Sequence, residues 1–145
     1  MSARSPTYPR ALLVTPARLP DADELVTEWP HEFLRHAPVD ERTAICVLTH
    51  DEKFDVPALK VAVTTPARFI GAMGSSRTTA RRRALLIEEG VSEDDLARIH
   101  APIGLPIGSR TPEEVAIAIG AQIVAVANHA PAPVVPDRAV GARVP

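Results

Sequence analysis

Two short polar stretches of this chain combine residue types that could bind an anion or move a proton. The first, Gly71-Ala72-Met73-Gly74-Ser75 with Arg77, follows a short apolar run and leads into a segment typical of a helix start. Glycines let the backbone approach a ligand closely, and the first turn of a helix offers free N–H groups and the positive end of its dipole. A cation at Arg77 opposes that dipole unless an anion shares the site. The stretch therefore predicts a phosphate site, and the alternative is a tight turn with a solvated arginine.

The second stretch is Thr49-His50-Asp51, which ends the continuous apolar run of residues 43–49. His50 is of the residue type that titrates nearest to neutral pH, so it could bind an anion, donate a proton or contact a cofactor. Asp51 could orient His50 or cap the turn toward Lys53. The alternative is that both side chains only hydrogen-bond the next loop. Because ligands of parallel sheets bind outside the carboxyl ends of strands, we expect this stretch and the glycine turn to be neighbours.

Further basic residues surround these stretches. Arg77 and Arg81 are one helical turn apart on one face, whereas Arg82 and Arg83 point elsewhere. Arg110 follows the Gly- and Pro-rich loop of residues 100–108, which contains Gly104, and precedes a helix start at Thr111. This loop is a second candidate anion site.

Composition restricts the class of protein. A chain of 145 residues is long enough for one core, and a formal net charge of −2 gives no sign of a nucleic-acid or anionic-membrane partner. Aromatic residues make up 3% against 46% hydrophobic residues, so the core must consist mainly of Ala, Val, Ile and Leu. The lone Cys46 excludes an internal disulfide and is expected in the core, and no Cys/His cluster has zinc spacing. Without a signal-peptide pattern or a membrane-spanning apolar run, we expect a cytoplasmic protein with no metal site.

Hydrophobic periodicity predicts alternating strands and helices. Strands are expected at residues 24–28, 43–49 and 67–70, with a short strand or loop at 11–14. Helices are expected to begin at Pro30, Asp55, Ser75 or Ser76, Ser92 and Thr111. This order predicts an α/β fold, a three-layer Rossmann-like parallel sheet over residues 11–128, with an irregular segment 1–10 and a disordered Pro-rich tail 129–145.

Side-chain patterns predict which helix faces are buried. In the helix capped by Asp55, the apolar stripe is Val56, Leu59, Ala62 and Val63. In the next long helix, which ends at Gly90, residues 85–87 should face inward. The helix at 115–127 is apolar nearly all round, so it is expected to be buried.

Three ordered motifs resemble the carboxyl-terminal Rossmann-like domain of the xanthine dehydrogenase accessory factor (XdhC/CoxI) family. They are Leu48-Thr49-His50-Asp51 with Lys53-Phe54-Asp55, Gly71-Ala72-Met73-Gly74-Ser75 with Arg77-Thr78, and residues 101–108 with Arg110-Thr111-Pro112-Glu113-Glu114. The resemblance covers about residues 9–128. It implies a protein that binds molybdenum cofactor (molybdopterin) or a nucleotide such as NAD(P) and aids delivery of the cofactor to a molybdenum hydroxylase client. The implied ligand-contact residues are Thr49, His50, Asp51, Gly71, Ala72, Met73, Gly74, Ser75, Arg77, Gly104 and Arg110.

The chain also departs from that family pattern. Only eight residues precede Pro9-Arg10, where family members carry a first β-α-β segment with a Gly-rich phosphate turn, and no Gly-x-Gly-x-x-Gly occurs. Tyr8 stands where an acid is expected, and Pro106 replaces another. The family domain is therefore expected to be truncated at its N-terminus, and the absence of the glycine motif argues against standard dinucleotide binding.

The missing first strand should leave one edge of the strand at 43–49 without a partner. We expect residues 5–14, a second copy in a homodimer, or a separate N-terminal accessory protein to fill that edge. The resemblance favours a binding and delivery module over an enzyme. The alternatives are half of a nucleotide-dependent oxidoreductase completed by a partner chain, and a non-catalytic regulatory subunit.

Overall fold

The computed structural model describes residues 14–131, and the expectations for residues 1–13 and 132–145 lie outside this range. The chain divides into two compact units after Pro102. The first unit contains the sheet and the residues of the first two polar stretches, and the second contains the last helix. None of the described helices has both the length and the apolar character needed to cross a bilayer.

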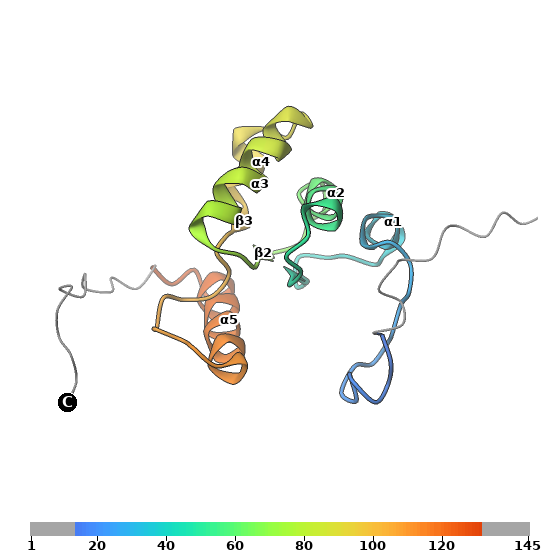
Figure 1. Cartoon of the computed structure of the whole chain (residues 1–145), viewed down its shortest axis with the longest axis vertical. Coiled ribbons are helices and arrows are strands. Elements are labelled where there is room, and N and C mark those ends of the chain that lie inside the picture. The colour runs from blue at the N-terminus through green and yellow to red at the C-terminus, as the bar shows by residue number, and fades with distance from the viewer. Residues whose placement is uncertain (1–13, 132–145) are drawn as a thin grey trace, which may run out of the picture. The chain divides into compact units, whose positions relative to one another are not determined.

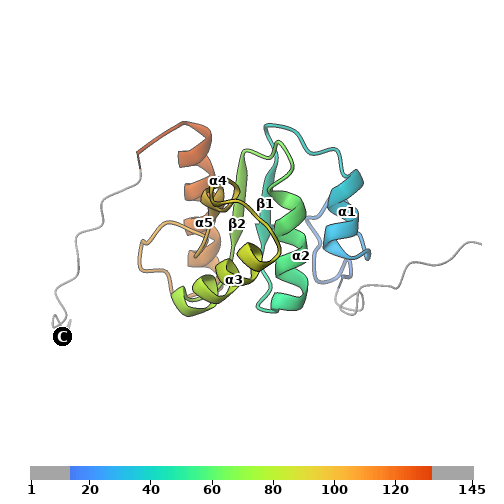
Figure 2. The ribbon, with the colours of Figure 1, turned by 90° about the horizontal axis from the view of Figure 1, so that it is seen from above.

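The first unit is built from strands that alternate with helices (Figure 1). Its elements are α1 (Pro30–His36), β1 (Ala44–Val47), α2 (Glu52–Ala62), β2 (Phe69–Ala72), α3 (Ser76–Glu88), α4 (Glu93–Ala97) and β3 (Ile99–His100). The strands are parallel in the order β1-β2-β3, with Ala44 opposite Phe69 and Ile70 opposite Ile99. Helices α2 and α3 lie on the same face of this sheet (Figure 2). The prediction of an α/β, Rossmann-like fold is confirmed.

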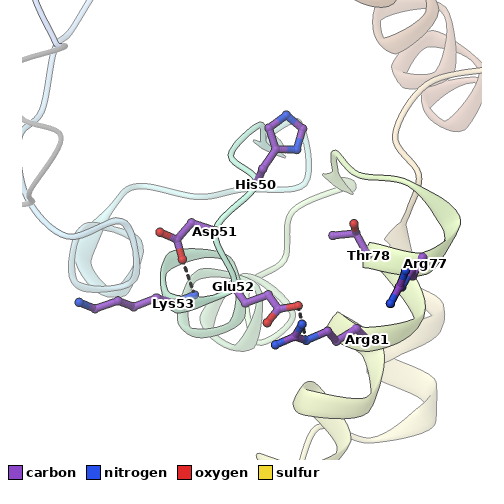
Figure 3. Close-up of a pocket in the computed structure, with 7 residues that line it drawn as sticks. All are labelled: His50, Asp51, Glu52, Lys53, Arg77, Thr78 and Arg81. Carbon is purple, nitrogen blue, oxygen red and sulfur yellow. Dashed lines mark hydrogen bonds and ion pairs between the residues drawn. The ribbon is translucent and has the colours of Figure 1, made fainter.

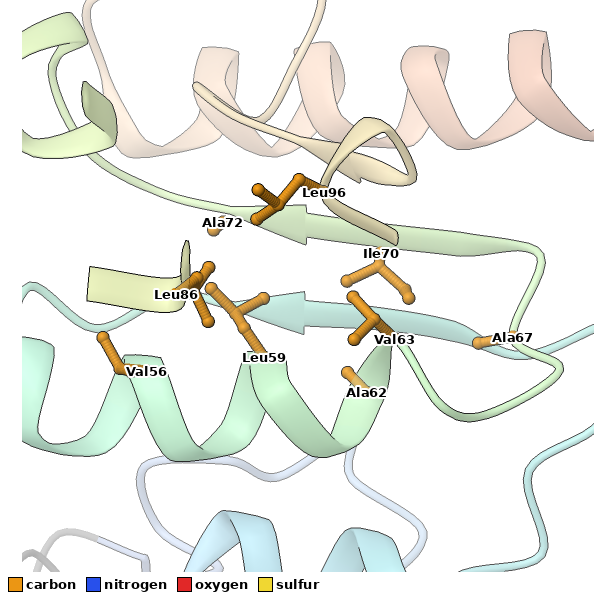
Figure 4. Close-up of a cluster of buried hydrophobic side chains, with 9 residues drawn as sticks. All are labelled: Val56, Leu59, Ala62, Val63, Ala67, Ile70, Ala72, Leu86 and Leu96. Carbon is orange, nitrogen blue, oxygen red and sulfur yellow. The ribbon is translucent and has the colours of Figure 1, made fainter. Parts of the chain in front are cut away.

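The hydrophobic core lies between α2, β2 and the helices that follow (Figure 4). Leu59 and Ala62 are fully buried, Val56 and Val63 are nearly so, and all four contribute to one cluster, which confirms the predicted stripe of α2. Leu86 of α3 and Leu96 of α4 close the cluster. The Trp29 ring, at the start of α1, packs on Phe54 of α2 with 5.4 Å between ring centroids.

One strand prediction is wrong and another is wrong in part. Residues 24–28 form no strand, because a five-residue alternation is stable as a strand only beside a partner strand. The strand at 43–49 is shorter, Ala44–Val47, and is not buried on both faces: Ala44 and Cys46 are exposed, and Leu48 is 49% exposed. The reason is its place in the sheet, because within residues 14–131 β1 pairs only with β2. Cys46 is therefore not a core residue.

Two helix predictions in this unit also need correction. The N-cap of α2 is Asp51, whose side chain accepts a hydrogen bond from the backbone N–H of Lys53, whereas Asp55 is a buried residue inside the helix. In α3, Leu86 is buried but Ile87 is 47% exposed. Consecutive helical residues point about 100° apart, so residues 85–87 cannot share one face. Ser75 and Ser92 cap α3 and α4 as expected.

The side chain of Arg98 links the end of α2 to the loop that leads into β2 by hydrogen bonds. Its guanidinium donates hydrogen bonds to the carbonyl oxygens of Val63, Thr65 and Ala67, at 2.9 Å for Thr65 and 3.0 Å for Ala67. The next two residues, Ile99 and His100, form β3, so the loop predicted at 100–108 begins one residue later than expected. The His100 ring stacks on Phe69, with 4.9 Å between centroids and 4° between planes.

The second unit consists of the loop after Pro102 and α5 (Pro112–Ala127). The predicted helix start is confirmed, because Thr111 and Glu114 form a capping box with Pro112 in the first turn. The prediction that α5 is buried nearly all round is wrong, since Ile117 is 65% exposed and Val124 is 59% exposed. Apolar composition alone does not bury a helix face unless another element packs against it.

Candidate functional site

The carboxyl end of β1 and the first turn of α3 line one open cleft of about 730 Å³ (Figure 3). Its walls come from the start of α2 on one side and the start of α3 on the other. The structure thus brings together His50, Asp51 and Arg77, as the parallel sheet predicts. The full lining is His50, Asp51, Glu52, Lys53, Arg77, Thr78 and Arg81.

Of the three residues that follow β1 in the predicted site, two make structural hydrogen bonds and one is exposed to a ligand. Thr49 turns inward, where its hydroxyl donates to the Asp55 carboxylate. The Asp51 carboxylate is 3.1 Å from the backbone nitrogen of Lys53 and caps α2, so of its two predicted roles the structure shows the cap (Figure 3). His50 is exposed at the rim of the cleft. It is therefore the residue of this stretch that is free to meet a ligand.

The glycine turn is shorter than predicted. Gly71 and Ala72 are buried inside β2, because pairing with β1 continues through Ala72, opposite Val47. The Met73 N–H extends this ladder by donating to the Val47 carbonyl at 2.9 Å. The chain turns only at Gly74 and Ser75, so Gly71 and Ala72 support the turn and are not part of it.

Gly74 is required by the fold of the turn itself. Its φ of +145° lies in a region that residues with a side chain rarely adopt. A Cβ at this position would also lie 3.1 Å from Thr78 Cγ2 and 3.2 Å from Thr78 Cβ. A Gly74→Val variant would therefore disrupt the turn itself, so a loss of binding in that variant would not show that a ligand approaches Gly74.

The charges in the cleft are unevenly paired. Arg81 forms an ion pair with Glu52 through a 2.9 Å contact between Nε and Oε1, which joins α3 to α2. Within residues 14–131, Arg77 forms no ion pair, although it lies one turn before Arg81 on the same face. The lining carries Lys53, Arg77 and Arg81 against two carboxylates, so its formal charge is positive. The arrangement suits an anionic ligand placed against Arg77 and the N–H groups of the first turn of α3.

Sequence reasoning missed a buried residue of α3, Arg82, which lies one helical turn after Thr78 of the cleft lining. It is 2% exposed and pairs with the fully buried Asp55 through a 2.7 Å contact between Nη2 and Oδ2. A signal was available, because Arg82 lies one turn before the buried Leu86, and Asp55 lies one turn before the buried Leu59. Both positions fall on inward faces, where a charged residue needs a partner.

Known proteins identify the family. The family model described as the XdhC Rossmann domain matches residues 6–123. The chain belongs to the XdhC Rossmann-domain family. Its resemblance to the carboxyl-terminal domain of the xanthine dehydrogenase accessory factors is confirmed.

The XdhC domain is similar to three curated bacterial proteins. It is 38% identical to the uncharacterized protein YqeB of Escherichia coli over 93 residues, 64% of this chain and 17% of YqeB. It is 32% identical to the E. coli molybdenum cofactor insertion chaperone PaoD, over 64% of this chain and 29% of PaoD. It is 27% identical to a probable xanthine dehydrogenase subunit of Bacillus subtilis, over 79% of this chain and 33% of that protein.

A solved structure shows the same fold. The crystal structure of a xanthine dehydrogenase from Bacillus halodurans matches with a TM-score of 0.68 and 29% identity, over 83% of this chain and 34% of that chain. This XdhC domain thus spans a third or less of the three curated relatives and about a third of the solved chain.

Gly104 and Arg110 of the second candidate site belong to the second unit of the XdhC domain. The Gly104 N–H donates to the side-chain oxygen of Gln122 at 2.7 Å, and the Arg110 N–H donates to the Glu114 carboxylate at 2.6 Å. These two backbone donors are therefore already engaged. The N–H groups of Arg110 and Thr111 hold the pKa of Glu114 below its ordinary value. Within the described residues, no group of three or more His, Cys, Asp or Glu side chains could hold a metal ion.

Proposed function

We propose that this XdhC domain takes part in the maturation of molybdenum hydroxylases by binding the phosphate of molybdenum cofactor, or of a nucleotide, in the cleft between α2 and α3. The observation that carries the proposal is Arg77, a cation without an ion-pair partner in the described residues, at the first turn of a helix in a positively charged cleft. The family match and the similarity to an insertion chaperone, PaoD, support the same class of function. Its client would be a molybdenum hydroxylase of the xanthine dehydrogenase or CO dehydrogenase type.

Each residue of the cleft has a distinct role in this proposal. The ligand phosphate would accept hydrogen bonds from Arg77 and from N–H groups at the start of α3, where the helix dipole favours an anion. Lys53 would add charge from the opposite wall. His50, exposed at the rim, would contact the ligand or exchange a proton with it during transfer to the client. The molybdenum cofactor is then cargo, which the domain holds and releases without chemical turnover.

Calorimetric titration with ADP and with molybdopterin released from a purified molybdoenzyme tests the site. Replacing Arg77 by alanine removes charge-assisted hydrogen bonds worth about 1.5–3 kcal/mol, so the affinity should fall by roughly 10- to 100-fold. Arg83→Ala is the matched control, because Arg83 is on the same helix but pairs with Glu93 away from the cleft. Equal binding by the wild-type protein and both variants would show that the site is misplaced.

The role of His50 is tested separately, by restoring activity to a client molybdoenzyme. His50→Gln keeps a hydrogen-bonding side chain at an exposed position, so the melting temperature should not change. If His50 contacts the cargo, the variant should lose the ability to restore client activity. Full restoration of client activity by the His50→Gln variant would show that His50 does not contact the cargo.

We also propose that another chain, either a second copy or a separate N-terminal accessory protein, covers the edge of β1 that no strand within residues 14–131 pairs with. Support comes from an apolar groove of about 210 Å³ beside that edge, whose lining includes Phe33, Leu34, Ile45 and Leu48. An uncovered strand edge with apolar side chains favours pairing with another chain. Sedimentation equilibrium at low micromolar concentration should show an oligomer. A folded monomer with slowly exchanging amides along β1 would show that no partner is needed.

A further inference from the structure

A buried ion pair joins α2 and α3, the two helices whose starts form the walls of the cleft. Asp55 of α2 is fully buried and Arg82 of α3 is 2% exposed, and Arg82 Nη2 is 2.7 Å from Asp55 Oδ2. Neither residue is among those that line the cleft. The pair is therefore placed to act on a ligand only through other residues.

Each member of the pair also bonds to the end of a strand. The hydroxyl of Thr49, the residue before His50, donates to Asp55 Oδ1. Arg82 Nη2 donates to the carbonyl oxygen of Met73, the residue before Gly74, at 2.9 Å. One continuous set of hydrogen bonds thus joins the chain entering His50 to the chain entering the turn before Arg77.

Stability does not explain this arrangement. Arg82 Nε and Nη1 are buried, and neither has a hydrogen-bond partner. A buried ion pair with unpartnered donors is a poor stabiliser, and well-packed apolar side chains often replace such pairs without loss. Asp55 and Arg82 flank the apolar core formed by Leu59 and Leu86, which could have extended to these two positions.

We infer that the Asp55–Arg82 pair positions the two walls of the cleft relative to each other, so that His50 and Arg77 face the same ligand. The inference rests on the proposed function in one respect, that His50 and Arg77 bind the same ligand. Without the pair, we expect the segments that follow the last hydrogen bond between β1 and β2, residues 49–51 and 74–77, to lose their fixed positions relative to each other. Arg82 and Asp55 are then positioning residues of the site.

The test replaces both charges with apolar groups in Asp55→Leu/Arg82→Met. The matched control is Lys60→Met/Glu89→Leu, which removes an exposed ion pair that also joins α2 to the end of α3, but at the end of α2 remote from the cleft. Amide hydrogen exchange without ligand measures the order of the two strand ends through N–H groups that are hydrogen-bonded there: those of Lys53, Phe54 and Asp55 after β1, and those of Met73, Thr78 and Thr79 after β2. Titration with ADP measures the affinity of the cleft for an anionic ligand.

We expect the Asp55→Leu/Arg82→Met protein to fold with a melting temperature close to that of the wild type. Its amides at both strand ends should exchange at least 10-fold faster, and its ADP affinity should fall at least 10-fold. The control should change neither. Unchanged exchange at both strand ends would overturn the inference, whatever the affinity.

A second variant covers the case in which the apolar pair fails to fold. The lysine side chain in Arg82→Lys is one atom shorter than arginine, so we expect it to pair with Asp55 and to lose the bond that Arg82 Nη2 also donates to the Met73 carbonyl. Faster exchange confined to the N–H groups of Met73, Thr78 and Thr79 in a folded protein would support the inference, and exchange like that of the wild type, or loss of the fold in this variant too, would overturn it. If wild-type protein binds neither ADP nor molybdopterin, the proposed function fails, while the exchange data still decide whether the pair joins the two strand ends.

Discussion

Replacing Gly74 by alanine should destabilise this domain by about 3 kcal/mol, although the change adds only one methyl group. The backbone of Gly74 has φ +145°, and a Cβ there would lie 3.1 Å from Thr78 Cγ2. An unfavourable backbone region costs of order 1–3 kcal/mol, and overpacking adds a similar amount. Because Thr78 is held by hydrogen bonds to Ser75, it cannot move away freely.

Gly90→Ala provides the matched comparison. Gly90 also has a positive φ, +84°, but a Cβ there would meet nothing within 4 Å. It should therefore cost only the backbone penalty of about 1–2 kcal/mol. The difference between the two variants isolates the contact with Thr78 and the more extreme backbone of Gly74.

Urea denaturation monitored by circular dichroism measures both effects. With a slope of about 2 kcal/mol per molar urea, the expected difference of about 1–2 kcal/mol separates the two midpoints by about 0.5–1 M. Equal midpoints for the two variants would refute the steric part of the reasoning. A neutral Gly74→Ala would refute the backbone part as well.

Two further predictions concern residues outside the cleft. Burial lowers the pKa of His100 below its ordinary 6.5, so the unfolded chain binds a proton at this residue more readily than the folded protein does. His100 therefore contributes its full stabilisation above about pH 6.5, and this contribution falls as the pH drops below that value. His100→Phe keeps an aromatic ring over Phe69 without titrating, so its urea midpoint should fall less between pH 7 and pH 5 than that of the wild type; parallel falls would contradict this. Arg98→Met removes hydrogen bonds to carbonyl oxygens including those of Thr65 and Ala67 and should lower the free energy of unfolding by about 2–4 kcal/mol, whereas a loss below about 0.5 kcal/mol would show that water replaces them.

Local chemistry explains which parts of the fold the sequence predicts well. The caps at Ser75, Ser92 and Thr111 depend on side chains and N–H groups within three residues, so their spacing is visible in the sequence. The stripe of α2 follows from helical geometry alone. The neighbouring positions of His50 and Arg77 follow from a general property of parallel sheets.

The errors concern features that depend on distant parts of the chain. Asp55 has the residue type of an N-cap, and its buried role depends on Arg82, 27 positions later. Gly71 has the residue type of a turn, and its place in β2 depends on how far β1 continues beside it. The exposure of Cys46 likewise depends on which strand lies beyond β1. Residue type and spacing do not contain these facts.

Because Cys46 is exposed on an edge strand, a thiol reagent can label the edge of the sheet at this one residue. It is the chain's single cysteine and lies on β1, an edge strand of the described sheet. The residue is exposed, but neighbouring protein atoms desolvate its sulfur in part and raise the pKa of the thiol, so alkylation by a maleimide should be slow near neutral pH and faster under alkaline conditions. Any chain that pairs with β1 would shield this sulfur. The rate of alkylation therefore gives a one-site footprint of assembly that needs no engineered label.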